Sequence, residues 1–277
     1  MTHELVSETG IPYGSGGGHL LFLDILRPDN SETTARPAVV WVHGGGWQAG
    51  QRQPNPNRTL AEHGFVTATI SYRFSQEAIF PAQIHDVKAA IRFLRGNHER
   101  FGIDPDRIGV WGHSAGGHLA ALAGVAGNVP EFEGDGGTPG VSSAVQAAVP
   151  LSPPTRLDQP TSNQDLDSAQ RQLLGHSAVH RAEFDRLARL ASPAKHARAD
   201  TPPFLILHGV VDNLVTIEDA RALAAALATA GAPVTLRELP GVDHSDVAIL
   251  GPIDGPITPV HHEIVAFFEA TLRLVED

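Results

Sequence analysis

Three short apolar runs constrain the fold of this chain more strongly than any other feature. They are VVWV at residues 39–42, IGVW at residues 108–111 and FLILH at residues 204–208. Nearly continuous apolar strands are typical of parallel sheets, because helices then cover both faces and bury both sides of each strand. The runs therefore predict an α/β sheet with two covered faces.

The rest of the chain fits this architecture, because predicted helices alternate with predicted strands. Strands are predicted at residues 20–26, 38–43, 65–72, 107–112, 145–151, 204–208 and 234–238. Helices with apolar residues at three-to-four spacing are predicted at residues 81–97, 115–126, 217–229 and 258–274. This order predicts a mostly parallel central sheet flanked by helices. Chains of this fold class and length often form one unit, so residues 1–277 are predicted to be a single domain.

Three stretches depart from the alternation. The glycine run at residues 14–18 is expected to be a mobile loop before the first strand, and residues 128–140, rich in Gly, Pro and acidic residues, a surface loop. Residues 152–200 are polar, with helices predicted at 168–174 and 181–190. Because this stretch lies between two strands of one sheet, we interpret it as a small cap inserted over the strand ends.

Composition excludes several classes of function. The net charge is −11 and no cluster of Lys and Arg occurs, which argues against a nucleic-acid partner. There is no cysteine, so the chain has no disulfide, no thiolate zinc site and no cysteine nucleophile. No apolar run approaches the roughly 20 residues that cross a bilayer, so no membrane span is expected. The polar opening, MTHELVSETG, lacks a secretory signal pattern, so a cytoplasmic location is expected.

The sequence GHSAG at residues 112–116 fits the motif G-x-S-x-G and lies between a predicted strand and a predicted helix. In that context the motif forms a sharp, strained turn that projects the serine hydroxyl above the sheet. Small residues must flank the serine, and Gly112 and Gly116 do so. A chance Gly/Ser turn is the alternative, but it would not explain the strand and helix around it. Ser114 is therefore the candidate nucleophile.

A second glycine motif, HGGGW at residues 43–47, directly follows the strand predicted at residues 38–43. Acyl transfer needs N–H groups that stabilise a developing oxyanion, and glycines let the backbone turn sharply enough to present them. The backbone N–H groups of Gly45, Gly46 and Ala115 are the candidate donors. A phosphate-binding loop is less consistent with the sequence, because no Lys-Ser/Thr follows and G-x-G-x-x-G is not fulfilled.

A serine hydroxyl needs a base, and the base needs an acid group that holds it in the correct tautomer. Asp212 lies just beyond the strand predicted at residues 204–208, and His244 lies in the loop after the next strand. The resulting chain order, Ser then Asp then His, is the one expected for this type of sheet enzyme. Ser114, Asp212 and His244 are therefore the candidate catalytic residues.

Other histidines and aspartates compete less well for these roles. His113 and His118 are too close to Ser114 in sequence to act as its base, and His208 belongs to a strand. The remaining weaker candidates are His261 and His262 at the start of the last helix, Asp243 and Asp246 beside the base, and Asp219 inside a predicted helix. No H-E-x-x-H pair occurs, so no metal site is expected.

Taken together, these motifs resemble the α/β-hydrolase superfamily, specifically the bacterial esterases related to hormone-sensitive lipase and to the BD-FAE (feruloyl-esterase-like) group. The matching segments are HGGGW at 43–47, SYR at 71–73, FPAQIHDVKAA at 80–90, GIDPDRI at 102–108 and GHSAGG at 112–117. The resemblance implies the α/β-hydrolase fold, the triad Ser114, Asp212 and His244, and the oxyanion donors Gly45, Gly46 and Ala115. His113 stands where the lipase relatives carry an acidic residue, which favours the BD-FAE group.

The sequence and the resemblance thus predict a serine carboxylesterase that needs no cofactor and hydrolyses small or short-chain carboxylic esters through an acyl-enzyme. Near the glycine loop, a buried Tyr72 and an ion pair of Arg73 with Asp86 are expected to be structural rather than substrate contacts. One alternative is an arylformamidase or a small peptidase that uses the same triad on amides. The other is a non-catalytic binding protein on a hydrolase fold. Such proteins typically lose a catalytic or oxyanion residue, and every such position is filled here.

Overall fold

A single mixed sheet organises the computed structural model, which describes residues 4–29, 35–53, 55–127, 129–245 and 258–273. The strands are β1 (Leu5–Gly16), β2 (His19–Pro28), β3 (Arg36–Val42), β4 (Val66–Ile70), β5 (Ile103–His113), β6 (Ala147–Leu151), β7 (Phe204–Gly209) and β8 (Val234–Leu239). Their order across the sheet is β1-β2-β4-β3-β5-β6-β7-β8. β2 runs antiparallel to β1 and β4, and the strands from β4 to β8 in this order are parallel neighbours. The prediction of a mostly parallel sheet is confirmed.

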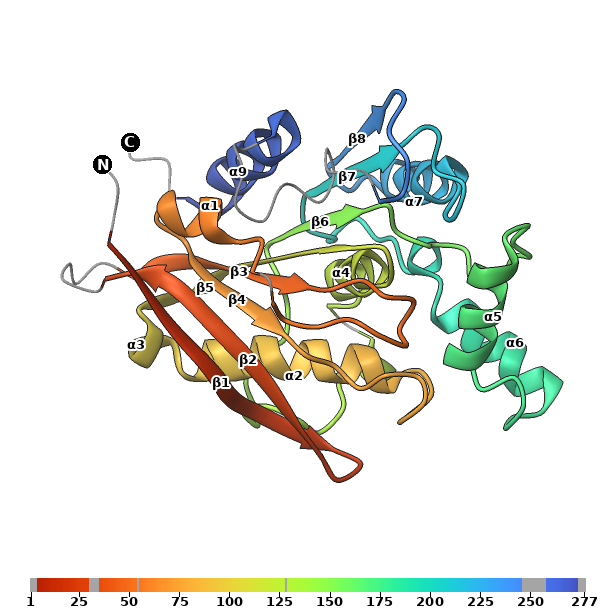
Figure 1. Cartoon of the computed structure of the whole chain (residues 1–277), viewed down its shortest axis with the longest axis horizontal. Helices are drawn as coiled ribbons and strands as arrows, with labels where there is room; N and C mark the ends of the chain where they lie inside the picture. The colour runs from red at the N-terminus through yellow and green to blue at the C-terminus, as the bar shows by residue number, and fades with distance from the viewer. Residues whose placement is uncertain (1–3, 30–34, 54, 128, 246–257, 274–277) are drawn as a thin grey trace.

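Helices cover both faces of the sheet (Figure 1). They are α1 (Arg58–Glu62), α2 (Ala82–Gly96), α3 (His98–Phe101), α4 (Ala115–Val125), α5 (Gln164–Leu173), α6 (Arg181–Leu190), α7 (Ile217–Ala230) and α9 (Pro259–Leu272). One buried cluster joins Val40 and Val110 to α2, α4 and α7, and a second joins Val39 and Trp111 to α1 and α9. Because successive strand residues point to opposite faces, each continuous apolar run supplies both clusters.

The N-terminal strand β1 differs from the prediction. Gly14, expected in a mobile loop, lies within β1 and pairs with Leu21 of β2, and the turn follows at Gly17 and Gly18. Among the described strands, β1 lies at the edge of the sheet and pairs with β2 alone, and most of its residues are partly or fully exposed. Its pairing also shifts register twice. A polar, irregular edge strand lacks the continuous apolar signal that identifies the buried strands.

The stretch between β6 and β7 carries α5 and α6, which lie beyond the carboxyl ends of the central strands in Figure 1. α6 has the predicted bounds, but α5 begins at Gln164 rather than at residue 168. The Asn163 side chain accepts hydrogen bonds from the Asp165 and Leu166 N–H groups and so caps the helix earlier. Residue 274, the predicted end of the last helix, lies outside the described residues. The single-domain assignment stays a prediction.

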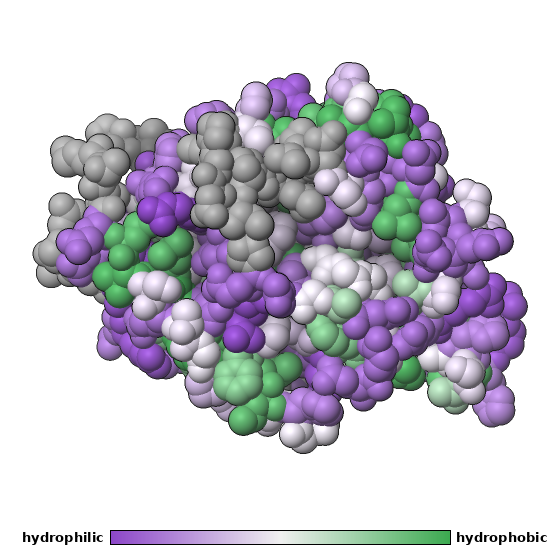
Figure 2. Space-filling model, in the orientation of Figure 1, coloured by the Kyte–Doolittle hydropathy of each residue, from purple (hydrophilic) through white to green (hydrophobic). Residues whose placement is uncertain are grey.

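Polar residues dominate the face shown in Figure 2, where hydrophobic residues form small, separate patches. The large hydrophobic side chains exposed in the described residues are Leu20, Ile79, Val210 and Val211. No helix in the described parts of the chain is both long enough and apolar enough to span a membrane.

Candidate active site

Ser114 stands at the turn where β5 ends and α4 begins. Its backbone has φ 57° and ψ −122°, a conformation that side-chain-bearing residues rarely adopt. Two main-chain hydrogen bonds hold the turn, from Ser114 N–H to Leu151 O at 2.9 Å and from His118 N–H to Ser114 O at 2.9 Å. The strained serine is thus fixed at the N-terminus of a buried helix, as G-x-S-x-G predicts.

The glycines around Ser114 are required by close backbone contacts. A Cβ at Gly112 would lie 2.5 Å from Gly116 O, and a Cβ at Gly116 would overlap the carbonyl oxygen of Val42. A Cβ at Gly117 would lie 2.6 Å from Leu151 O. The turn therefore packs directly against the neighbouring strands β3 and β6. Ser114 thus lies at the carboxyl end of a strand in the middle of the sheet.

The structure brings Ser114, Asp212 and His244 together. His244 Nε2 lies 2.9 Å from Ser114 Oγ, and His244 Nδ1 lies 2.7 Å from Asp212 Oδ2. The three residues follow β5, β7 and β8, respectively, and each is at most 9% exposed. This is the geometry in which an imidazole held by a carboxylate removes the proton of a serine hydroxyl.

Asp212 is held as an anion by its surroundings. Burial opposes its ionisation, but hydrogen bonds from His208 and His244 and from the Val215 N–H outweigh burial and keep the pKa of Asp212 well below its usual value. Oδ1 accepts the N–H groups of Leu214 and Val215 at 3.0 and 2.8 Å, so the carboxylate cannot rotate freely. Oδ2 is thereby aimed at His244.

The competing residues have other partners. Asp219 accepts hydrogen bonds from the backbone of Thr155 and pairs with Arg156 at 3.1 Å. Asp243 accepts from Ser245 N–H, and Asp246 lies outside the described residues. The competing histidines also have other partners. His113 contacts His244 O, and His118 contacts Trp47 and Ala191. His208 contacts Asp212 and Val215, and His261 contacts Thr258. None of these four is hydrogen-bonded to Ser114 Oγ in the described residues.

The glycine loop, residues 43–47, turns sharply beside Ser114. Gly45 and Gly46 have φ values of 115° and 61°, and Gly45 O accepts the N–H groups of Gln48 and Ala49. Within the described residues, the N–H groups of Gly45, Gly46 and Ala115 donate to no protein acceptor. A Cβ at Gly44 would lie 3.3 Å from Ser114 Cβ, so the loop lies directly against the nucleophile. These donors can therefore serve a negatively charged oxygen at Ser114.

Two side chains hold the glycine loop: Tyr72, which the sequence predicts to be buried near it, and Trp47, to which the sequence assigned no role. Tyr72 donates its hydroxyl hydrogen bond to His43 O at 3.0 Å, and Trp47 Nε1 donates to His118 Nδ1 at 3.2 Å. His118 in turn donates from Nε2 to Ala191 O at 2.7 Å. Trp47 directly follows the glycines and His118 comes four residues after Ser114, and this spacing was the only available signal. Arg73 pairs with Asp86 at 2.7 Å, an arrangement that suits the structural role expected for these residues.

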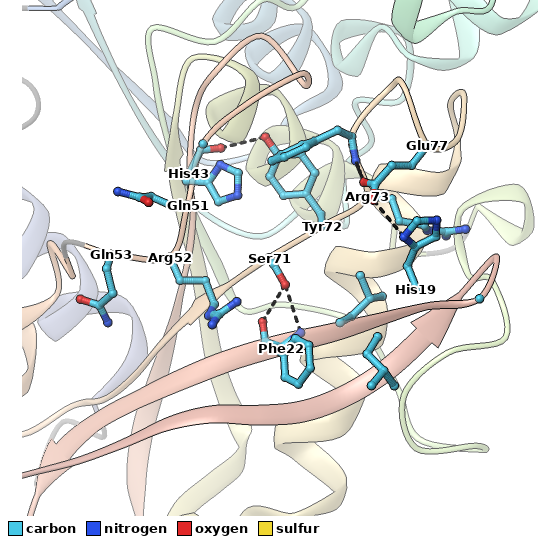
Figure 3. Close-up of a pocket in the computed structure, with 15 residues that line it drawn as sticks. His19, Phe22, His43, Gln51, Arg52, Gln53, Ser71, Tyr72, Arg73 and Glu77 are labelled. Carbon is cyan, nitrogen blue, oxygen red and sulfur yellow. Dashed lines mark hydrogen bonds and ion pairs between the residues drawn. The ribbon is translucent and has the colours of Figure 1, made fainter.

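A cavity of about 720 Å³ lies beside the glycine loop, and Figure 3 shows the residues that line it. Its walls come from residues 18–22, His43, residues 50–53, residues 71–74 and Glu77. In Figure 3, the stacked rings of His43 and Tyr72 form one side, and Phe22 of β2 lies opposite. The charged groups at the walls have partners: Arg73 with Asp86, Arg52 with Asp24, and His19 with Glu77. The cavity thus presents a partly aromatic wall with no unpaired charge among these groups.

The described residues contain no group of three or more His, Asp or Glu side chains suited to hold a metal ion. The chemistry available at the site is that of the serine, the imidazole, the carboxylate and the backbone N–H groups.

Comparisons with known proteins agree with this arrangement. The BD-FAE family model matches residues 23–227. Esterase LipQ of Mycobacterium tuberculosis is 36% identical over 242 residues, which cover 85% of this chain and 56% of that protein. The chain therefore spans just over half the length of this curated relative.

Solved structures resemble the chain over most of its length. A truncated carbohydrate esterase from gut microbiota is 30% identical, with a TM-score of 0.80, and the match covers 98% of this chain and 97% of that one. The propionate-bound esterase 2 of the planctomycete Thermogutta terrifontis is 29% identical, with a TM-score of 0.76, and the match covers 95% and 92% of the two chains.

Proposed function

Since this chain belongs to the BD-FAE family and has the α/β-hydrolase fold, as the sequence motifs predicted, we propose that it is a serine carboxylesterase. The observation that carries the proposal is the pair of hydrogen bonds joining Ser114 Oγ to His244 Nε2 and His244 Nδ1 to Asp212 Oδ2. The esterases among its relatives support the same chemistry.

In the proposed reaction Ser114 Oγ attacks the ester carbonyl carbon while its proton passes to His244 Nε2. The carbonyl oxygen becomes an oxyanion that accepts hydrogen bonds from the N–H groups of Gly45, Gly46 and Ala115. Asp212 stabilises the imidazolium that forms. When the tetrahedral intermediate collapses, the bond to the alcohol oxygen breaks and His244 gives its proton to the leaving alcohol.

The second half of the reaction repeats these steps with water. His244 removes a proton from a water molecule, the water oxygen attacks the acyl carbon, and a second oxyanion forms in the same position. Collapse then releases the carboxylic acid and returns the proton to Ser114 Oγ. Because one imidazole serves both halves, it must be neutral at the start of each, and the Asp212 carboxylate fixes its proton on Nδ1.

We propose small or short-chain esters as substrates, without a nucleic-acid partner and without a cofactor. The related esterase with propionate bound supports a short acyl group. The cytoplasmic location expected from the polar opening residues stays a prediction, and fractionation of cells that carry the native chain tests it.

The proposed function is tested with p-nitrophenyl acetate, butyrate and octanoate beside N-formylkynurenine and an aminoacyl anilide. We expect the short esters to be hydrolysed fastest, and Ser114→Ala to lower kcat by about 10⁴-fold or more without changing the melting temperature. Faster turnover of an amide would assign the site to amide hydrolysis instead. Equal activity of wild type and Ser114→Ala would contradict the assignment of the nucleophile.

A further inference from the structure

His113 is a buried residue beside the nucleophile that the proposed reaction leaves without a role. It lies at the end of β5, immediately before Ser114, and is 7% exposed. Its Nε2 lies 2.9 Å from the main-chain oxygen of His244, and the centroids of the two imidazole rings are 4.8 Å apart. A side chain of the serine turn thus contacts the backbone of the candidate base.

The chemistry of this contact fixes the state of His113. A carbonyl oxygen only accepts hydrogen bonds, so Nε2 of His113 carries the proton and donates it. Burial, followed by the nearby charge that His244 gains on protonation, lowers the pKa of His113 to about 3. The ring is therefore neutral and keeps the same donor throughout the pH range in which a serine esterase works.

The segment that follows β8 and carries His244 is also bonded to the loop that follows β7. Val210 N–H donates to Leu239 O at 2.9 Å, and Val211 N–H donates to Val242 O at 3.2 Å. These two bonds connect the segment to the loop that carries Asp212. The bond from His113 connects it to the turn that carries Ser114.

We propose that His113 is a positioning residue that fixes the main chain of His244 and so keeps Nε2 within reach of Ser114 Oγ. This inference rests on the proposed function. It also gives a physical role to the variable position of G-x-S-x-G in this chain, because any residue there is carried by the same rigid turn as the nucleophile.

Three variants test the proposal by ester hydrolysis. His113→Leu removes the hydrogen-bond donor. His113→Asn has an amide that is too short to reach His244 O, whereas His113→Gln places an amide N–H where Nε2 stands. We expect kcat to fall by about 10- to 100-fold in the Leu and Asn variants, with KM within about threefold, because small misplacements of a catalytic group reduce the rate steeply. The Gln variant is expected to recover most of kcat.

His196→Leu is the matched control. It removes another histidine that contacts a main-chain oxygen, Leu190 O at 2.8 Å, in the stretch between β6 and β7. Its kcat is expected to stay within about twofold of wild type. If His113→Leu does not fold, the kcat values of His113→Asn and His113→Gln are compared instead, and they decide whether the hydrogen bond is needed. The proposal is overturned if Asn and Gln have equal kcat, or if Leu keeps full kcat. An inactive wild-type protein would instead contradict the proposed function itself.

Discussion

Replacing Asp212 with Asn gives the sharpest test of the proposed triad, because it changes charge and hydrogen-bonding sense with almost no change in shape. Oδ1 of Asp212 accepts the N–H groups of Leu214 and Val215. An asparagine must keep its oxygen at that position, because an amide NH₂ group cannot accept them. The NH₂ group then takes the place of Oδ2 and faces His244 Nδ1 at about the present 2.7 Å.

Facing a donor, His244 must accept at Nδ1 and carry its proton on Nε2, the atom that lies 2.9 Å from Ser114 Oγ. In that tautomer the imidazole cannot remove the serine proton. A triad left in the wrong tautomer loses about 10⁴-fold in kcat, which corresponds to about 5 kcal/mol of transition-state stabilisation. We expect a loss of this size for Asp212→Asn with p-nitrophenyl butyrate as substrate.

The control is Asp243→Asn, one residue from the base. Asp243 is exposed and bonds only to Ser245 N–H among the described contacts, so its kcat is expected to stay within about twofold of wild type. Because the pKa of Asp212 is held well below its usual value, the difference between the variants should persist throughout the pH range of the assay. If Asp212→Asn keeps more than a tenth of wild-type kcat, or if Asp243→Asn loses as much activity as Asp212→Asn, the tautomer argument is wrong.

Two further predictions concern stability. Gly116→Ala places a methyl group on the carbonyl oxygens of Val42 and His43, and we expect it to lower the free energy of unfolding by about 3 kcal/mol in urea titrations. Gly127→Ala, which meets no atom within 4 Å, should change it little. Burial lowers the pKa of His118 to about 4, so the unfolded chain binds more protons than the folded protein between about pH 6.5 and pH 4. Stability should fall as pH decreases through this range, by roughly 3 kcal/mol from this group, and the fall should be smaller in His118→Gln.

The sequence predicted the structure well where a short pattern is compatible with a single local structure. Residues 39–42 and 108–111 are apolar on both sides, and only a strand covered on both faces buries such a run. The glycines of residues 112–116 were equally clear, because Gly112 and Gly116 touch backbone atoms that leave no room for a side chain. In these segments the prediction depended on a few neighbouring residues.

The sequence was less informative where contacts join distant segments. β1 is recognised only through its pairing with β2, since its own residues are largely exposed. The bond from Tyr72 to His43 O spans 29 residues, and that from Trp47 to His118 spans 71. No periodicity or motif encodes such distances. The choice of side chain at these positions becomes understandable only once the sheet has brought the loops together.

The long-range hydrogen bonds around Ser114 all come from neutral, buried side chains. This explains how the site can be well ordered although Ser114 has a strained backbone. Tyr72, Trp47, His113 and His118 are neutral donors, and each is buried or nearly so. Surface ion pairs are weakened by salt and by the entropy of long side chains, whereas a buried neutral hydrogen bond is not screened by salt. Losing one such bond leaves a buried carbonyl or ring nitrogen without a partner, which costs about 1–3 kcal/mol. These buried hydrogen bonds therefore oppose movement of the loops around Ser114, which holds its backbone at the positive φ that the serine turn requires.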